Sequence, residues 1–189
     1  MHHTKRLFAA VKVHPSDGFL KLYNQIRSAL RNERINWVNP ANMHLTIKFF
    51  GETHVQKIPE IDGCLAAASA RIQVFDLEIK NTGMFGSSYQ PRVIWFGIDD
   101  GGHLQQLFLE TAEQLKTIGI FPDRQNFVPH LTIGRVKELR DKRNFQEVLD
   151  MYREHNSGWQ TIHELVLYES ILRREGPEYI PIQRYNFKE

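Results

Sequence analysis

Two histidines are the residues best placed to do chemistry in this chain, because each begins a copy of the tetrapeptide His-Leu-Thr-Ile. The copies occupy residues 44–47 and 130–133, and each follows a short proline-containing segment within an apolar run. An imidazole titrates near neutral pH, so one histidine can accept a proton while the other donates one. Such a pair suits acid/base catalysis at a phosphodiester, where each group contributes a rate factor of about 10²–10⁴ in favourable cases.

The threonine of each copy has the spacing needed to share the surface of its histidine. Side chains at positions i and i+2 of a strand point to the same face, so His44 should project with Thr46, and His130 with Thr132. Threonine hydroxyls are short donors that suit the non-bridging oxygens of a phosphate. If the two strands face each other across a cleft, two imidazoles and two hydroxyls converge there.

A basic residue follows each motif, and strand alternation predicts different orientations for the two. Lys48 is four residues after His44, so an ideal strand places it on the same face. There it is either an added positive charge at the cleft or a solvated lysine at the end of the strand. Arg135 is five residues after His130, so an ideal strand points it away. Arg135 reaches the cleft only if the strand ends or twists before it, and is otherwise structural.

A single His-x-Thr on a strand is more often structural than functional, but its recurrence in matched contexts favours the functional interpretation. No HExxH motif or Cys/His array accompanies it, so the sequence implies no metal and no cofactor. Cys64 is the only cysteine and lies in an expected helix, which favours a buried structural thiol and excludes an intrachain disulfide. The remaining histidines have no evident partner: His2, His3, His14, His54, His103, His155 and His163.

Hydrophobic periodicity indicates the elements that position the motifs. Strands are expected over residues 6–13, 43–50, 74–80, 92–98, 130–136, 161–172 and 179–187. Helices are expected from Ser16 or Asp17 to about Leu30, over 55–72, from about 101 to a stop at Gly119, and around 145–152. Residues 83–91 are expected to form a loop. No low-complexity linker divides the chain, and we interpret the pattern as an α+β fold of two related lobes.

Composition and charge exclude several classes of protein. The 189 residues are 41% apolar with a formal net charge of +2, an ordinary soluble composition. The apolar stretch at 7–13 is too short for a signal peptide or a membrane span, so we expect a cytoplasmic protein without membrane contact. A monomer is the default expectation. The modest charge does not establish a nucleic-acid partner, but it is compatible with an anion held in a local positive site.

These features resemble the 2H phosphoesterase superfamily, which is named for two His-x-Thr-x motifs. Within it the chain most resembles the bacterial and archaeal RNA 2′,3′-cyclic phosphodiesterases, also called 2′-5′ RNA ligases. The similarity covers nearly the whole chain. It is carried by residues 6–8 (RLF), 44–51 (HLTIKFFG), 83–85 (GMF), 91–95 (PRVIW), 129–135 (PHLTIGR) and 167–170 (LYES).

The resemblance implies a single domain over residues 1–189, made of two intertwined, pseudo-symmetric lobes of antiparallel sheet with flanking helices around a central cleft. It also implies hydrolysis of a terminal 2′,3′-cyclic phosphate to a 2′-phosphomonoester. His130 would activate the water and His44 would protonate the departing O3′, with the roles exchanged in reverse 2′-5′ ligation. Thr46 and Thr132 would contact the phosphate, and Arg135 corresponds to the family's arginine after the second motif.

The expected partners are RNA ends or small cyclic nucleotides that carry a 2′,3′-cyclic phosphate. Candidates for stacking a nucleobase are Phe8, Phe50, Phe85 and Tyr168, although core packing is the default for each. The alternative function is a non-catalytic module that binds nucleotides or RNA ends with the same His/Thr clamp. Both motifs are complete, which favours catalysis.

Overall fold

The protein folds as two antiparallel sheets with helices at both ends, in a computed structural model that describes residues 3–122 and 127–189. The first sheet has the order β3-β1-β8-β9, and the second has the order β2-β6-β5-β4-β7. This confirms the expected α+β class. The first sheet consists of β1 (Thr4–Lys12), β3 (His44–His54), β8 (Glu164–Arg173) and β9 (Gly176–Asn186). The second consists of β2 (Arg34–Trp37), β4 (Phe75–Gly86), β5 (Pro91–Asp99), β6 (His130–Glu138) and β7 (Asn156–Ile162).

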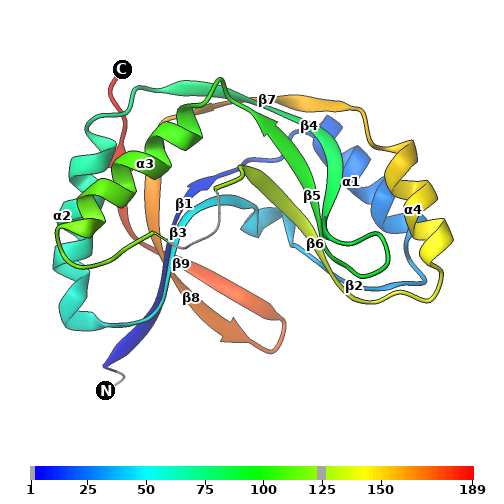
Figure 1. Cartoon of the computed structure of the whole chain (residues 1–189), viewed down its shortest axis with the longest axis horizontal. Helices are drawn as coiled ribbons and strands as arrows, with labels where there is room; N and C mark the ends of the chain where they lie inside the picture. The colour runs from blue at the N-terminus through cyan, green and yellow to red at the C-terminus, as the bar shows by residue number, and fades with distance from the viewer. Residues whose placement is uncertain (1–2, 123–126) are drawn as a thin grey trace.

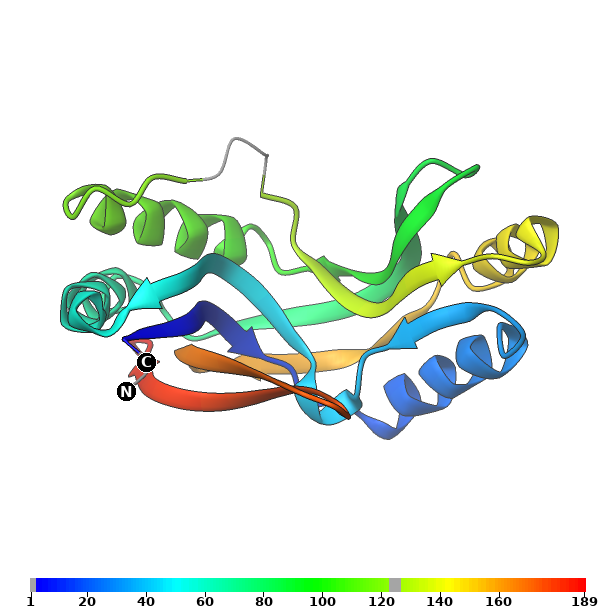
Figure 2. The ribbon, with the colours of Figure 1, turned by 90° about the horizontal axis from the view of Figure 1, so that it is seen from below.

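The helices lie in two pairs at opposite ends of the molecule (Figures 1 and 2). Helices α2 (Ile58–Ser69) and α3 (His103–Lys116) pack together beside the first sheet, and α1 (Asp17–Ala29) and α4 (Lys142–Met151) lie beside the second. The chain crosses between the sheets, because α1 follows β1 yet contacts β7, and α3 follows β5 yet contacts β3. Short 3₁₀ helices, η1 (Pro40–Asn42) and η2 (Val55–Lys57), flank β3.

Helix ends follow the capping signals in the sequence. The Ser16 hydroxyl accepts the Phe19 N–H at 3.1 Å and begins α1, as expected for a serine at this position. The Asp141 carboxylate caps α4 in the same way, 2.9 Å from the Asn144 nitrogen. Gly119 follows the last turn of α3 with a φ of +78°, a left-handed conformation that favours glycine.

The apolar residues of both motifs are buried in one core that spans the two sheets. Leu45 and Ile47 of β3 are 2% and 3% exposed, and Leu131 and Ile133 of β6 are fully buried. This confirms the alternation expected within each tetrapeptide. Burial of each such side chain contributes about 1.5–3 kcal/mol, so the core holds the strands that carry the histidines.

Three elements differ from the sequence expectation. The short strand β2 was not expected, and β4 continues to Gly86 through part of the expected loop. Gly83 is required there for close packing, since a Cβ at this position would lie 2.3 Å from the Trp95 ring. The expected strand 161–172 is divided between the two sheets, because Ile162 ends β7 and Glu164 begins β8.

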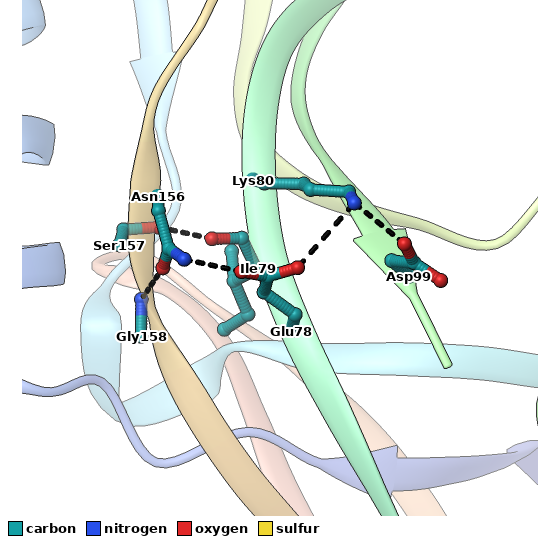
Figure 3. Close-up of polar contacts among 7 residues, drawn as sticks. All are labelled: Glu78, Ile79, Lys80, Asp99, Asn156, Ser157 and Gly158. Atoms are coloured by element: carbon teal, nitrogen blue, oxygen red, sulfur yellow. Dashed lines mark hydrogen bonds and ion pairs between the residues drawn. The ribbon is translucent and has the colours of Figure 1, made fainter. Parts of the chain in front are cut away.

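Polar contacts bind β7 to the second sheet through β4 (Figure 3). The Ser157 hydroxyl donates to the Ile79 carbonyl at 2.9 Å, and the Asn156 amide donates to the Glu78 carboxylate. On the other side of β4, the Lys80 ammonium lies 2.5 Å from the Asp99 carboxylate of β5. Exposed ion pairs contribute little to stability, so among these side-chain contacts the buried Ser157 hydrogen bond contributes most.

Candidate active site

The two motif histidines are held by matched hydrogen bonds. The Nδ1 atom of His44 lies 2.7 Å from the Asn42 carbonyl oxygen, and that of His130 lies 2.7 Å from the Val128 carbonyl oxygen. A carbonyl can only accept, so Nδ1 of each ring carries the hydrogen and donates it. In the neutral ring, Nε2 is then the unprotonated nitrogen that is left to react.

The first motif contains a β-bulge. Along the β1–β3 ladder, Ala10 pairs with Thr46 and Ala9 pairs with Lys48, so Ile47 has no partner of its own. An extra residue of this kind reverses the alternation of the strand beyond it. Lys48 and Phe49 therefore point to the faces opposite to those that simple strand parity predicts.

The bulge removes Lys48 from the site and replaces it with Phe49. Lys48 is only 9% exposed, and its ammonium donates to the Phe121 carbonyl at 3.2 Å. The prediction that Lys48 shares the face of His44 is therefore wrong. Phe49 takes that face with Thr46 instead, and its ring is 45% exposed.

The second motif has a bulge at the same position of its tetrapeptide. Along the β5–β6 ladder, Trp95 pairs with Thr132 and Ile94 pairs with Gly134, so Ile133 has no partner of its own. The two copies of His-Leu-Thr-Ile thus share a backbone irregularity as well as a sequence. In each copy the extra isoleucine stays buried while the strand bends around it.

This second bulge turns Arg135 toward the histidines. Arg135 pairs with Val93, which lies on the same face of β5 as Trp95, the partner of Thr132. Arg135 therefore shares the face of Thr132 and His130, and its side chain is exposed. The parity argument against Arg135 does not hold, because it assumed an unbroken strand.

Both histidines have a pKa below the ordinary value of 6.5. Burial lowers the pKa of His44 to about 4, in spite of the hydrogen bond to Asn42, and the positive charges of Lys12 and Arg135 lower it further. Burial also lowers the pKa of His130. The backbone hydrogen bond to Val128 opposes this effect, and the charge of Arg135 adds to it. The guanidinium thus acts on both imidazoles. Strands β3 and β6 contact each other directly, which brings the two motifs together.

Aromatic side chains enclose the His44 ring. The ring centroids of Phe8 and Tyr179 lie 4.9 Å and 5.1 Å from that of His44. Tyr179 belongs to β9, and the β8–β9 hairpin reaches the first motif because the Asn42 amide donates to the Pro177 carbonyl at 2.8 Å. Sequence reasoning missed Tyr179, since no local pattern connects it with a motif more than a hundred residues earlier.

An open pocket of about 480 Å³ adjoins the His130 ring. It is lined by Phe85, Gly86, Ser87, Gln90, Arg92, Val128 and His130. The Phe85 ring meets the His130 ring edge-on, with a centroid distance of 4.6 Å. Among the four residues expected to stack a base, only Phe85 lines this pocket, whereas Phe8 and Tyr168 are buried and Phe50 packs against the main core.

The described residues contain no group of three or more His, Cys, Asp or Glu side chains arranged to hold a metal ion. Within the same residues, no helix is long and apolar enough to cross a membrane. The side chains of Lys12 and Arg135 place positive charge near the histidines. A third cation, Arg6, lies with its guanidinium carbon 5.2 Å from the centre of the exposed Phe49 ring. The site therefore suits an anion next to an aromatic surface.

Two antiparallel sheets that each present a His/Thr pair define a phosphoesterase of the two-histidine class. The model of the LigT-like phosphoesterase family matches residues 11–95 and 97–179, and the chain belongs to this family of enzymes.

Known relatives match over most of their length. The RNA 2′,3′-cyclic phosphodiesterase of Thermotoga maritima is 41% identical over 152 residues, which cover 80% of this chain and 79% of that protein. The RNA 2′,3′-cyclic phosphodiesterase of Methanocaldococcus jannaschii is 31% identical over 180 residues, which cover 95% of this chain and 99% of that protein.

Solved structures share the fold at lower identity. The protein TT0787 of Thermus thermophilus superposes with a TM-score of 0.79 at 20% identity, covering 97% of this chain and 98% of that one. E. coli LigT complexed with 3′-AMP superposes with a TM-score of 0.73 at 24% identity, covering 98% of this chain and 99% of that one. The two-sheet architecture is therefore that of LigT-like phosphoesterases.

Proposed function

We propose that this enzyme is an RNA 2′,3′-cyclic phosphodiesterase that hydrolyses a terminal 2′,3′-cyclic phosphate to a 2′-phosphomonoester. The observation that carries the proposal is the matched setting of His44 and His130, each with Nδ1 bound to a backbone carbonyl and Nε2 left to react. The names of the Thermotoga and Methanocaldococcus relatives support the same substrate class. The substrates are RNA ends and small cyclic nucleotides.

In the proposed reaction, water forms a bond to phosphorus and the bond from phosphorus to O3′ breaks. His130 Nε2 takes a proton from the water, and protonated His44 gives one to O3′, so the phosphate stays on O2′. The hydroxyls of Thr46 and Thr132 donate to non-bridging oxygens. The Arg135 guanidinium, which the bulge places on the same face, adds a charge-assisted contact to the phosphate.

One feature supports this division of roles between the histidines. His130 borders the open pocket, from which a nucleophile can approach, whereas His44 is enclosed by Phe8 and Tyr179. The pKa of His44, which burial lowers to about 4, leaves this imidazole neutral near pH 7 in the free enzyme, so proton donation by His44 requires that the bound substrate raise this pKa. The bound phosphate supplies the negative charge that favours protonation of an adjacent imidazole. In reverse 2′-5′ ligation the same two groups exchange roles.

Phe49 offers a surface for the terminal nucleobase. Its ring is 45% exposed on the face of His44 and Thr46, and the Arg6 guanidinium lies against it. Stacking of a base on such a ring contributes about 1–3 kcal/mol and tolerates any sequence. An enzyme that acts on RNA ends benefits from this tolerance.

The test uses an oligonucleotide with a 2′,3′-cyclic phosphate, in buffer that contains EDTA. We expect wild-type protein to yield a 2′-phosphate, and His44→Ala or His130→Ala to lower kcat by about 10²–10⁴-fold without loss of fold. An exposed histidine remote from both motifs, His163, provides the control variant His163→Ala. Full activity in either motif variant, or a 3′-phosphate product, would contradict the mechanism. Tight nucleotide binding without turnover would favour a binding module that uses the same clamp.

A further inference from the structure

We propose that Asn42 is a positioning residue for His44 and that it ties the β8–β9 hairpin to the peptide group that fixes the reactive tautomer of the imidazole. This inference rests on the proposed function, because it concerns how the proposed proton donor is held ready for the leaving oxygen. Asn42 is the last residue of the 3₁₀ helix η1 and lies two positions before His44. Its side chain is half-buried.

Asn42 makes hydrogen bonds to two different parts of the molecule. Its carbonyl oxygen accepts the Nδ1–H of His44 at 2.7 Å, and its side-chain amide donates to the Pro177 carbonyl oxygen at 2.8 Å. The first contact sets which ring nitrogen of His44 carries the hydrogen. The second anchors the residue that presents this carbonyl, so the carbonyl is held in the direction of the ring. One residue therefore joins the imidazole to the start of β9.

The same hairpin touches the His44 ring from a second side. Tyr179 follows Pro177 by two positions, and its ring meets that of His44 edge-on, with a centroid distance of 5.1 Å. Phe8 of β1 packs against both rings, with a centroid distance of 4.9 Å to each. A shift of the hairpin would therefore move the carbonyl contact and the ring contact together. The hairpin thus acts on the orientation of His44 by two routes, and Asn42 provides the polar one.

The rest of the turn before His44 is held by contacts that do not involve the hairpin. The Asn39 side chain accepts the Ala41 N–H at 3.0 Å, and the Lys12 ammonium donates to the Ala41 carbonyl. These contacts fix the peptide groups on either side of Ala41, whereas the carbonyl that faces His44 belongs to the next peptide group. The two asparagines of one short turn thus have separate tasks, which makes Asn39 a matched control for Asn42.

The second motif provides an internal comparison. The Nδ1 atom of His130 lies 2.7 Å from the carbonyl oxygen of Val128, which also lies two positions before its histidine. The Val128 side chain is 52% exposed and has no polar atom, so it cannot form an anchor of the kind that Asn42 forms. A change at Asn42 should therefore alter His44 and leave His130 as it is.

The tautomer matters because the proposed reaction uses Nε2 of His44. In the protonated ring both nitrogens carry a hydrogen, and the Asn42 carbonyl holds the one on Nδ1, so the proton on Nε2 is the one delivered to O3′. The neutral ring that remains keeps its hydrogen on Nδ1 and takes up the next proton at Nε2. Without the anchor, the neutral ring gains access to the other tautomer, in which Nε2 already carries the hydrogen and cannot accept one. Part of the enzyme is then in an unreactive state, which lowers kcat.

The first measurement reads the tautomers directly. Long-range proton–nitrogen NMR spectra of the imidazole rings distinguish the two neutral tautomers, and the signals are assigned with His44→Gln and His130→Gln. Near pH 7 and without substrate, we expect wild-type protein to show both motif rings neutral, with the hydrogen on Nδ1. Asn42→Ala should give a mixture of tautomers at His44 and an unchanged His130. Asn39→Ala should match wild type at both rings.

Kinetics on a 2′,3′-cyclic nucleotide give the second measurement. We expect Asn42→Ala to lower kcat by about three- to tenfold, the effect of one hydrogen bond, and to leave KM unchanged, because Asn42 is not one of the groups proposed to bind the phosphate or the base. In the double variant with Tyr179→Leu, the loss in kcat should be smaller than the product of the two single losses, since both changes free the same ring from the same hairpin. If Asn42→Ala does not fold, Asn42→Ser takes its place with the same expectations, because the shorter serine side chain does not span the distance to Pro177.

The outcomes separate this inference from the proposed function. If wild-type protein does not hydrolyse the cyclic nucleotide, the proposed function fails, while the spectra still decide the role of Asn42. A wild-type tautomer at His44 in Asn42→Ala overturns the inference, and so does an equal change at His130 or in Asn39→Ala. A higher KM at unchanged kcat, or a simple product of the losses in the double variant, overturns it as well.

Discussion

The reactivity of the site is set at the level of single atoms. A carbonyl oxygen 2.7 Å from Nδ1 of His44, and another at the same distance from Nδ1 of His130, fix the tautomer of each neutral ring. Strand parity could predict that His44 and His130 each project with a threonine. It could not predict these carbonyl partners, because they depend on how the chain bends just before each strand.

The lowered pKa values predict an acid-shifted pH profile for kcat/KM. Catalysis requires one imidazole with a proton and one without, and both values in the free enzyme lie below 6.5, that of His44 at about 4. As pH rises above the higher value, both rings become neutral and activity falls. As pH drops below about 4, both become protonated and activity falls again. We expect a bell with its maximum below pH 6.5 when kcat/KM for a cyclic nucleotide is measured from pH 3.5 to 9.

The variant Arg135→Gln should move this bell toward higher pH and weaken activity at all pH values. It removes the positive charge that lowers both histidine pKa values. Arg31→Gln, at an exposed position beyond the end of α1, is the control for a general change in charge. A bell centred above pH 7 in wild-type protein would argue against paired buried histidines.

At the level of elements, the bulges decide which side chains reach the site. The sequence predicts both motif strands and the burial of Leu45 and Leu131, because alternation within a tetrapeptide is a local property. It does not reveal the bulges at Ile47 and Ile133, since a bulge is defined by pairing with a strand elsewhere in the chain. The position of Lys48 was mispredicted for this reason, and the orientation of Arg135 could not be decided.

Packing at Gly83 supports the second motif strand, and it predicts a measurable loss of stability. A Cβ at Gly83 would lie 2.3 Å from the Trp95 ring, and Trp95 pairs directly with Thr132. We expect Gly83→Ala to lower the free energy of unfolding by about 1–3 kcal/mol, as overpacking does, and to reduce activity as well. Urea denaturation followed by fluorescence measures the first effect.

The matched control is Gly63→Ala in helix α2, where a Cβ meets nothing within 4 Å. Alanine is favoured over glycine inside a helix by about 0.5–1 kcal/mol, so this variant should be as stable as wild type or more so. If Gly83→Ala were as stable as Gly63→Ala, the Trp95 ring would have to move away at little cost. The proposal that packing at Gly83 supports the strand of Thr132 would then be wrong.

At the scale of the whole molecule, the site depends on contacts between distant segments. The sequence predicts an α+β fold and most of its elements. It does not predict that the β8–β9 hairpin reaches Asn42 through the Pro177 carbonyl and places Tyr179 against His44. A hydrogen bond between residues 135 positions apart leaves no periodic signal in either segment. The aromatic enclosure that lowers the pKa of His44 is therefore a property of the assembled fold.

The distribution of charge over the molecule predicts a short footprint on RNA. The net charge is only +2, and the cations near the site among the described residues are few, chiefly Arg135, Arg6, Lys12 and Arg92. For single strands, log affinity falls with log salt concentration by about 0.7 per phosphate contact, so roughly three contacts give a slope near 2. We expect a plot of log kcat/KM against log KCl concentration to have this shallow slope for cyclic-phosphate oligonucleotides. The measurement covers 50 to 300 mM KCl, a range of about sixfold.

Lengthening the oligonucleotide beyond a few residues should leave the slope unchanged, because we expect the added phosphates to lie beyond the cations beside the histidines. Arg6→Gln should lower the slope by about 0.7, the value of one lost contact, whereas Arg31→Gln should leave it as it is. A slope that grows steadily with RNA length would instead require a basic track that continues away from the histidines. In that case, recognition would extend along the RNA body, and the terminal cyclic phosphate would be only one part of the substrate that the enzyme binds.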